Sequence, residues 1–537
     1  MAYPRPLFSR PRPARLESVL VGAIVLAFLA VSLASFWQNS LTYDEESHFR
    51  YGKQLLELNS KRFDDSKMPF SALNALPARF ASLLRPETDL PLGRQVNLGR
   101  AVTILVSALF GLGVFSWGKE LYGFYPGLLA LFLYTFEANI LAHSQLVTTD
   151  IYAMGMVLLS TYMLWRYARQ PGWRQALAFA IMLGVSQLAK YTSISLYPLL
   201  AGILLIHDAP QISRWIAARD KQAWGAYLRR LLLLAMVVLI VSILIINLGF
   251  LFRDTLTSLG DYQFRSSLFN AAQRRLDFLS NVPIPLPYPY LEGLDWIIYN
   301  ERTGSNVGRI YLFGQMNEAG FPGYYFYAFL FKVPLAIQLL ILISLLFYLK
   351  ERGYRQLLTN ELFLLAPVLF YAIYFNYFYR AQIGIRYFLV VSPFLLIFTG
   401  RLALTWQARS TTIKYLVGAL LTYLVVSVLS YYPYYIPYFN ELVPDRRLAY
   451  RVLADSNLDW GQAGKAVQRY LEDYPEAQVD PPTPVSGRVL VSANNLVGIT
   501  AKPETYAWLR ENYLPVDTIA YAYLVYEIQA TGTTNPP

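Results

Sequence analysis

Long apolar segments recur along most of this chain and constrain its fold more than any other feature. A hydrocarbon core of about 30 Å is crossed by roughly 17–25 apolar helical residues, and about eleven segments approach that length. We expect membrane spans near residues 18–37, 97–117, 124–142, 151–168, 175–191, 193–207, 230–251, 325–348, 361–379, 387–403 and 414–430. The first run continues into "SFWQNS" without a small-residue cleavage site, so we expect a retained anchor rather than a cleaved signal peptide.

Composition agrees with a membrane protein. Of the 537 residues, 55% are hydrophobic and only 15% are charged, whereas a soluble domain has about 25% charged residues. The formal net charge is +11, but the basic residues fall at the ends of apolar segments, where membrane topology places them, so we expect no nucleic-acid partner. The absence of cysteine excludes disulfides, thiolate metal sites and cysteine nucleophiles.

Basic residues also predict the orientation. The N-terminus carries Arg5, Arg10, Arg12 and Arg15, and every second connection after it is basic as well. The positive-inside rule therefore places the N-terminus in the cytoplasm, and an odd number of spans places the C-terminus outside.

Three outward regions are longer than plain connectors. Two are loops, at about 38–96 and 252–324, within a predicted transmembrane catalytic domain of residues 1–430. The third is a tail of residues 431–537, in which helix-period and strand-period segments alternate. The predicted fold is thus a polytopic α-helical membrane protein with about 11 transmembrane helices and a small α/β extracytoplasmic C-terminal domain.

The stretch "TYDEESHF" concentrates charge at the outer end of the first span. Thr42 and Glu45 have the T-x-x-E spacing of a helix-capping box, which offers a purely structural interpretation. On a helix, however, Asp44 and Glu45 would both share a face with His48. A carboxylate beside an imidazole can accept a proton or bind a metal, so a catalytic interpretation stands beside the structural one.

A second outward cluster lies in "FEANILAHSQLVTTD". It contains Glu137, His143 and Asp150. Ionisable groups within or beside a span are candidates for function. The structural alternatives are an N-cap role for Asp150 and a Glu137 side chain that reaches toward the surface.

Four cations near the outer face run against the positive-inside trend. They are Lys190, Lys332, Arg380 and Arg386. They could reach toward lipid phosphates, or they could bind a substrate phosphate, to which arginine offers a fork of donors and lysine a point charge.

Outward acids and cations on a lipid-embedded scaffold suit a substrate with an anionic head and a lipid tail. A sugar joined to a polyprenyl phosphate is such a substrate, and its leaving group is already a phosphate. Cations or a metal can stabilise the departing charge, and one carboxylate suffices as a base for the acceptor's proton. Attack from the opposite face would invert the anomeric centre.

Several motifs resemble blocks of one family, in the family's order. "YDEESHF", "NILAHSQLVTTD", "LAKYTS", "YLFGQMNEAGFPGYYFYAFLFKVPL", "GIRYFLVVSP" and "LADSNLDWGQ" are similar to segments of bacterial GT-C superfamily glycosyltransferases of the protein O-mannosyltransferase-like family 39. The resemblance implies a GT-C fold in a bacterial-type plasma membrane, a polyprenyl-phosphate sugar donor, and a glycan, lipid or protein acceptor. It implies that Asp44 matches the family's catalytic first-loop aspartate, with Glu45 beside it, and that Asp150 matches the acid of the second outward loop.

Some questions stay open at the level of sequence. A divalent metal ion is one alternative, with Glu137, His143 and His48 as candidate ligands. The block "DSNLDWGQ", from Asp455 to Gln462, could bind the acceptor or could dock the tail onto the membrane domain through Trp460. A transporter or a non-catalytic membrane protein that binds glycan or lipid is the alternative to the enzyme.

Overall fold

Long apolar helices form the body of the protein in this computed structural model, which describes residues 14–59, 64, 66–84, 90–305, 308–351, 357–404 and 410–529. The helices of the body are α1 (Ala14–Phe36), α4 (Leu92–Tyr122), α5 (Phe124–Thr135), α6 (Ala138–Ser144), α7 (Asp150–Arg169), α8 (Trp173–Ser186), α9 (Leu196–Ala217), α10 (Lys221–Gly249), α13 (Tyr324–Lys332), α14 (Leu335–Glu351), α16 (Leu362–Ile373), α17 (Ser392–Gly400) and α18 (Thr411–Leu429). The predicted class of polytopic helical membrane protein is therefore confirmed.

The predicted number of spans is not confirmed. In the described part of the chain, seven helical segments are long and apolar enough to cross a membrane, or up to nine if each of two bent helix pairs counts as one span. The predicted spans 151–168 and 175–191 correspond to α7 and α8, which fall outside that set. Helix α8 has only 14 residues, and α7 carries Asp150, Arg166 and Arg169 within its 20 residues.

Two predicted spans are broken near the charged end of the body. The segment 325–348 bends by 109° between α13 and α14, where Pro334 lacks the amide donor that a continuous helix needs and holds Val333 in an extended conformation. The segment 124–142 bends by 64° between α5 and α6. There Glu137 is extended, and its Oε2 accepts a hydrogen bond of 2.6 Å from Ile140 N, so the side chain caps α6.

Helix α7 lies at the centre of the body. Its residues Ile151, Tyr152, Met154 and Leu158 are buried. It packs against α4, α8, α9, α16, α17 and the 3₁₀ segment Ile385–Val391. A helix surrounded by protein does not need the hydropathy of a lipid-facing one, which explains the modest apolarity of α7.

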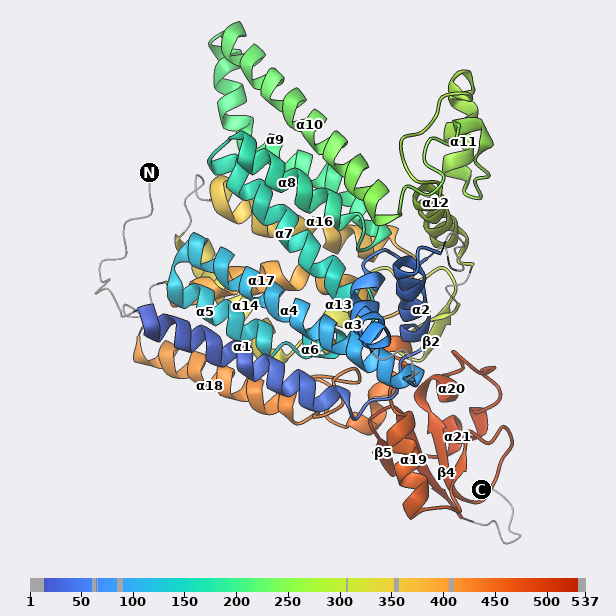
Figure 1. The fold of residues 1–537 in the computed structure, drawn as a ribbon. Helices are drawn as coiled ribbons and strands as arrows, with labels where there is room; N and C mark the ends of the chain where they lie inside the picture. Colours follow the sequence, from blue (N-terminus) through green and yellow to red (C-terminus); the bar gives the residue numbers. More distant parts are fainter. Residues whose placement is uncertain are drawn as a thin grey trace.

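The polar elements gather at one end of the body, on the right in Figure 1. The first of the loops predicted to face outward contributes α2 (Glu45–Leu56) and α3 (Ser71–Leu84). The second contributes α11 (Ser267–Arg275), α12 (Tyr288–Thr303) and a hairpin of β1 (Ile310–Leu312) and β2 (Gln315–Asn317). The tail lies at the same end, whereas α1 begins at the opposite end (Figure 1).

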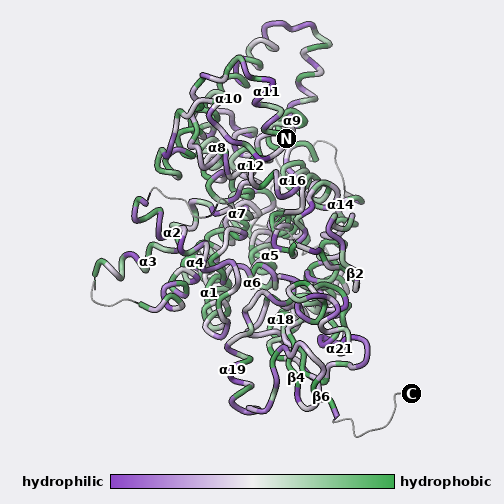
Figure 2. The backbone as a smooth tube through the Cα atoms, turned by 90° about the vertical axis from the view of Figure 1, so that its right-hand side faces the viewer, coloured by the Kyte–Doolittle hydropathy of each residue, from purple (hydrophilic) through white to green (hydrophobic). Residues whose placement is uncertain are grey.

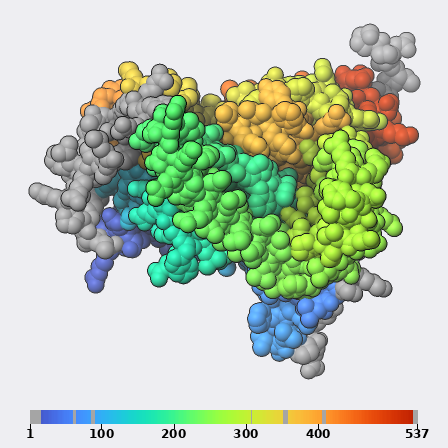
Figure 3. All heavy atoms as spheres, turned by 90° about the horizontal axis from the view of Figure 1, so that it is seen from above, coloured from blue at the N-terminus to red at the C-terminus, as the bar shows by residue number. Residues whose placement is uncertain are grey.

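The hairpin of helices α9 and α10 projects from the body at the upper left of Figure 1, away from α2 and the tail. Hydrophilic residues mark its tip in Figure 2, and they also follow one helix of the tail, α19 (Gly464–Asp473). Seen from above, α10 crosses the face of the molecule and the segment after it covers one end of that face (Figure 3).

The tail folds around a four-stranded sheet. Its strands β3 (Gln478–Val479), β4 (Gly487–Ser492), β5 (Asp517–Ile519) and β6 (Tyr523–Ile528) lie in the order β3-β4-β6-β5. Strands β3 and β4 are parallel, and the other two pairs are antiparallel. Besides α19, the tail contains the short helices α20 (Ala493–Val497) and α21 (Ala507–Asn512). The tail therefore combines helices with a small sheet, as expected for a small α/β unit.

Candidate active site

Asp44 and Arg386 form an ion pair at the polar end of the body. Asp44 precedes the first residue of α2, and its Oδ2 accepts a hydrogen bond of 2.9 Å from Arg386 Nη1. Arg386 lies in the 3₁₀ segment that leads into α17, and its guanidinium carbon is 4.2 Å from the ring centroid of Trp460. The structure thus brings together a carboxylate from the first outward loop, an arginine from position 386 and an aromatic ring from the tail.

A second ion pair also lies against Tyr387. Asp150, the first residue of α7, accepts a hydrogen bond of 2.7 Å from Lys190 Nζ, and that Nζ is 3.9 Å from the ring centroid of Tyr387. The guanidinium carbon of Arg386 is 5.4 Å from the same centroid. Tyr387 therefore contacts the cation of both pairs, so the acids of the two outward loops and their cations belong to one cluster.

Electrostatics determine the protonation of the two groups from the first loop. Burial opposes ionisation of Asp44, but the charges of Arg386 and Lys67 outweigh it and lower the pKa of this carboxyl below its usual value. Burial, together with the charge of Lys67, lowers the pKa of His48 to about 3. At neutral pH, Asp44 is therefore ionised and His48 is neutral, with its Nδ1 3.2 Å from Ser71 Oγ.

Glu45, which the sequence offered as a catalytic residue beside Asp44, is enclosed. Glu45 and Arg100 have no exposed side-chain surface, and Arg100 Nη2 lies 2.6 Å from Glu45 Oε2. Arg100 Nε and the amides of Thr42 and Val147 also donate to this carboxylate. Thr42 Oγ1 donates to Glu45 Oε2 as well, and within the described residues it does not accept a bond from the helix amides as the capping interpretation required. Glu45 therefore fixes the first loop to α4 and to the loop before α7.

The side chains of Lys332 and Glu137 are likewise hydrogen-bonded to other groups of the protein. Lys332 Nζ donates to the carbonyls of Ile436 at 2.7 Å and Asn457 at 2.5 Å, and only 1% of the residue is exposed. Glu137 caps α6 and also accepts a hydrogen bond of 2.7 Å from Asn139 Nδ2. Lys332 thus holds the tail onto the bend between α13 and α14 rather than facing the ion-pair cluster.

The two remaining predicted residues have different positions. His143 is buried in α6, with its ring centroid 5.9 Å from that of Trp460; within the described residues its Nδ1 has no hydrogen-bond partner. Arg380 is exposed, and its Nη1 donates to the carbonyl of Arg302 at 3.1 Å. His143 therefore borders the cluster behind Trp460, whereas Arg380 belongs to the contact with α12.

The predicted metal ligands do not form a metal site. Among the residues that the structure describes, no group of three or more His, Cys, Asp or Glu side chains could hold a metal ion. Glu137 is occupied by Asn139 and Ile140, and His48 faces Ser71. Within the described residues, these two candidates are thus bonded to protein groups rather than gathered around a common point.

The "DSNLDWGQ" loop of the tail is bonded to both parts of the cluster. Asn457 Oδ1 accepts a hydrogen bond from Ile385 N at 3.0 Å, and Ser456 Oγ donates to Ile383 O at 2.5 Å. Gly384, with φ of +103°, lies between these two contacts, and a Cβ there would come within 2.3 Å of Ser456 Oγ. On the other side, Tyr43 N donates to Trp460 O at 3.0 Å. This block therefore docks the tail onto the membrane domain, and its Trp460 also contacts Arg386 of the ion pair.

Three residues of the site were not predicted. Lys67 influences both Asp44 and His48, Tyr387 lies against both cations, and Arg100 neutralises Glu45. Only Arg100 carried a recognisable signal, because it is an ionisable residue within a predicted span.

The fold and the cluster define a polytopic membrane protein whose opposed charges meet at one end of a helical bundle. Residues 92–246 match the family model described as dolichyl-phosphate-mannose-protein mannosyltransferase. This segment runs from α4 into α10 and includes Asp150 and Lys190, and the match confirms the resemblance to GT-C glycosyltransferases through this part of the chain. No curated protein matches the sequence.

Three solved structures show a distant likeness. The apo oligosaccharyltransferase of Archaeoglobus fulgidus is 15% identical with a TM-score of 0.45, over 78% of this chain and 55% of that one. Its complex with an inhibitory peptide and a dolichol-phosphate is also 15% identical, with a TM-score of 0.45 over 79% of this chain and 55% of that one. ArnT from Cupriavidus metallidurans bound to undecaprenyl phosphate is 12% identical, with a TM-score of 0.30 over 96% of this chain and 98% of that one. The chain spans about half the length of the oligosaccharyltransferase.

Proposed function

We propose that this protein is a membrane glycosyltransferase that moves a sugar from a polyprenyl-phosphate-linked donor to an acceptor on the extracytoplasmic side. The observation that carries the proposal is the pairing of Asp44 with Arg386 beside the pairing of Asp150 with Lys190. Two acids and two cations on one cluster supply a base and a phosphate site together. The family match through residues 92–246 supports the same class of reaction.

Exposure selects Asp44 as the base. Its side chain is 28% exposed, whereas the side chain of Asp150 is 4% exposed and that of Glu45 is fully buried. A general base must come within hydrogen-bond reach of the acceptor hydroxyl. Of the three acids only Asp44 is open to a substrate, so we assign it the proton and assign Glu45 to the positioning of the loop.

Arg386 and Lys190 are the proposed binding groups for the donor phosphate. Arginine presents a planar fork that matches phosphate oxygens, and lysine adds a point charge. The leaving group departs as a phosphate, so these cations stabilise its charge and no carboxylic acid has to protonate it. With Asp44 on the acceptor side and the cations on the donor side, displacement inverts the anomeric centre.

The ion pair also suggests how the base becomes active. While Arg386 is bonded to Asp44, the guanidinium balances the charge of the ionised carboxylate and keeps the pKa of Asp44 low. A donor phosphate competes for the guanidinium. When Arg386 turns to the phosphate, Asp44 loses its partner, its pKa rises, and it becomes a stronger base at the moment when the donor is bound.

The proposed orientation in the membrane follows from the basic residues at the tip of the α9–α10 hairpin. Arg214, Arg219 and Lys221 lie where α9 joins α10, at the tip of a hairpin that points away from α2 and the tail (Figure 1). The positive-inside rule puts that tip in the cytoplasm. The cluster and the tail then face the extracytoplasmic side.

An Asp44→Asn variant tests the proposal. Cells that lack the gene are complemented with the wild type, with the variant or with Glu46→Gln, and mass spectrometry compares their lipid and glycoconjugate fractions. Glu46 is a matched control because it lies in the first turn of α2, two residues after Asp44, is 47% exposed and pairs with Arg50. We expect the sugar-modified product to appear with the wild type and Glu46→Gln but to be absent with Asp44→Asn at equal protein level. Unchanged product from Asp44→Asn would contradict the assignment.

A further inference from the structure

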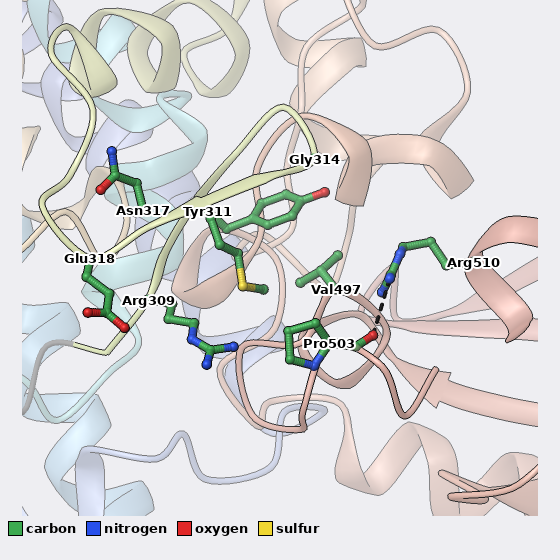
Figure 4. Close-up of a pocket in the computed structure, with 9 residues that line it drawn as sticks. Arg309, Tyr311, Gly314, Asn317, Glu318, Val497, Pro503 and Arg510 are labelled. Atoms are coloured by element: carbon green, nitrogen blue, oxygen red, sulfur yellow. Dashed lines mark hydrogen bonds between the residues drawn. The ribbon is translucent and has the colours of Figure 1, made fainter. Parts of the chain in front are cut away.

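A cavity of about 420 Å³ lies between the β1–β2 hairpin and the tail. The hairpin side contributes Arg309, Tyr311 and Glu318, and the tail side contributes Pro503 and Arg510 (Figure 4). Its volume falls in the range of small-molecule sites, about 300–1,000 Å³. It belongs to the polar end of the molecule but shares no lining residue with the ion-pair cluster.

Two charged side chains of the cavity form no ion pair with the described part of the chain. Within the part of the chain that the structure describes, neither Arg309 nor Glu318 has a salt-bridge or hydrogen-bond partner of its side chain. Arg510 donates to the carbonyls of Leu496 at 2.7 Å and Pro503 at 3.2 Å, which fixes the wall but leaves its charge without a counter-ion. Two arginines and one glutamate give the cavity a net charge of +1.

The chemistry of the lining combines three kinds of contact. The guanidinium of Arg309 offers paired donors that fit a carboxylate or a phosphate. Asn317 and Glu318 offer an amide and a carboxylate for hydroxyl groups. The ring of Tyr311, with Met316, Val497 and Pro503, provides an apolar face. A sugar ring that carries an acidic group presents the complementary set.

The tail side of this cavity is linked to the reaction site. Val497 ends α20, and Asn494 of the same short helix donates from Nδ2 to Asp459 O at 2.8 Å and accepts from Asp455 N at 2.8 Å. These contacts hold the loop that carries Trp460 against Arg386. One five-residue helix thus supports both a cavity wall and the aromatic side of the ion-pair cluster.

We infer that this cavity is a subsite for an anionic saccharide, the part of the acceptor glycan that is remote from the reacting hydroxyl. The acceptor role rests on the proposed function, whereas saccharide binding does not. Binding energy from a remote part of a substrate can position its reacting end. The acceptor is then a glycan with a carboxylate or phosphate rather than a peptide.

Binding to the full-length protein in detergent tests this inference. Two probes are compared by isothermal titration: trigalacturonic acid, which is anionic, and maltotriose, which is neutral. We expect the acid to bind at least 10-fold tighter. Arg309→Ala should weaken binding of the acid by at least 10-fold, because a hydrogen bond to a charged group contributes about 1.5–3 kcal/mol. Arg275→Ala, which removes an exposed arginine of α11, should not change it.

A second variant separates a local effect from misfolding. Glu318→Gln removes the negative charge and should tighten binding of the acid, whereas an unfolded variant would bind less. Asp44→Asn should bind the acid like the wild type, so loss of transfer in that variant and loss of binding in Arg309→Ala report on different proposals. Equal affinity for the two probes, or no change with Arg309→Ala, would overturn the inference while leaving the proposed function standing.

Discussion

Asp44 and Arg386 are 342 positions apart in the chain, yet their Oδ2 and Nη1 atoms lie 2.9 Å apart. The contact joins the first outward loop to the segment before α17, and Trp460 of the tail covers the guanidinium. Three distant parts of the sequence therefore meet at one arginine.

Replacement of Arg386 by lysine should impair donor binding. Lysine keeps the charge but loses the planar fork and the stacking on Trp460, so the substitution is not conservative at this position. We expect KM for the donor to rise at least 10-fold, measured from initial rates over a range of donor concentrations. Arg380→Lys serves as the control, because Arg380 is exposed and its Nη1 donates to the carbonyl of Arg302, away from Asp44. An unchanged KM in Arg386→Lys would exclude a bidentate phosphate contact.

The Asp150–Lys190 pair should show strong coupling in stability. Asp150 is 4% exposed and Lys190 is 18% exposed, so Lys190→Met leaves a buried carboxylate without its partner, at a cost of about 3–5 kcal/mol. Asp150→Asn together with Lys190→Met should recover much of the thermal stability, measured by intrinsic fluorescence in detergent, but should not recover transfer. If the double variant were no more stable than Lys190→Met, the pair would not be coupled.

Glu45→Gln should affect folding rather than only the reaction. Glu45 and Arg100 are both fully buried, and removal of one charge from such a pair costs about 3–5 kcal/mol. We expect a clear fall in unfolding temperature and in the yield of folded protein. Glu46→Gln on the same helix should change neither, because Glu46 is half exposed. A Glu45→Gln protein with wild-type stability and no transfer would instead favour direct catalysis by Glu45.

The pH profile should lack a histidine transition. The pKa of His48 is about 3, mainly because the ring is buried, so the ring is neutral at every pH above 5. The pKa of Asp44 lies below its ordinary value of 3.8 because of Arg386 and Lys67, although burial opposes this. The stability that Asp44 contributes is therefore present above pH 4 and is lost as the pH falls through its folded-state pKa.

The pH profiles of the wild type and of His48→Gln check the protonation state of His48. We expect kcat/KM to show no inflection near pH 6.5, and His48→Gln to preserve the shape of the profile between pH 5 and pH 7. An inflection near pH 6.5 that disappears in His48→Gln would show that the imidazole titrates in its ordinary range.

The sequence predicted which loops carry the site better than it predicted the role of each residue. Asp44, Asp150, Lys190 and Arg386 were all expected at the outer face, because charges there run against hydropathy and topology. Their pairing could not be predicted, since it depends on contacts between positions up to 342 apart. Lys332 shows the limit: a lysine in an apolar segment looks the same whether it faces a phosphate or the two carbonyls that it actually binds.

The exact number of spans stays unconfirmed. A criterion of length and hydropathy leaves out α7, which is surrounded by protein and only modestly apolar, and α8, which is only 14 residues long. The breaks at Glu137 and at Pro334 had local signals, a capping acid and a proline, but both were embedded in runs apolar enough to suggest one continuous helix.

The hydrogen bonds between the first loop and the tail have a consequence for biogenesis. Lys465 N donates to Ser40 Oγ across 425 positions, and Ser40 N donates to Gln462 O. At about 5–20 residues per second, the ribosome needs roughly 20–85 s to make the chain between these contacts. The loop that holds Asp44 can therefore gain these contacts only after residues 462–465 have been synthesised.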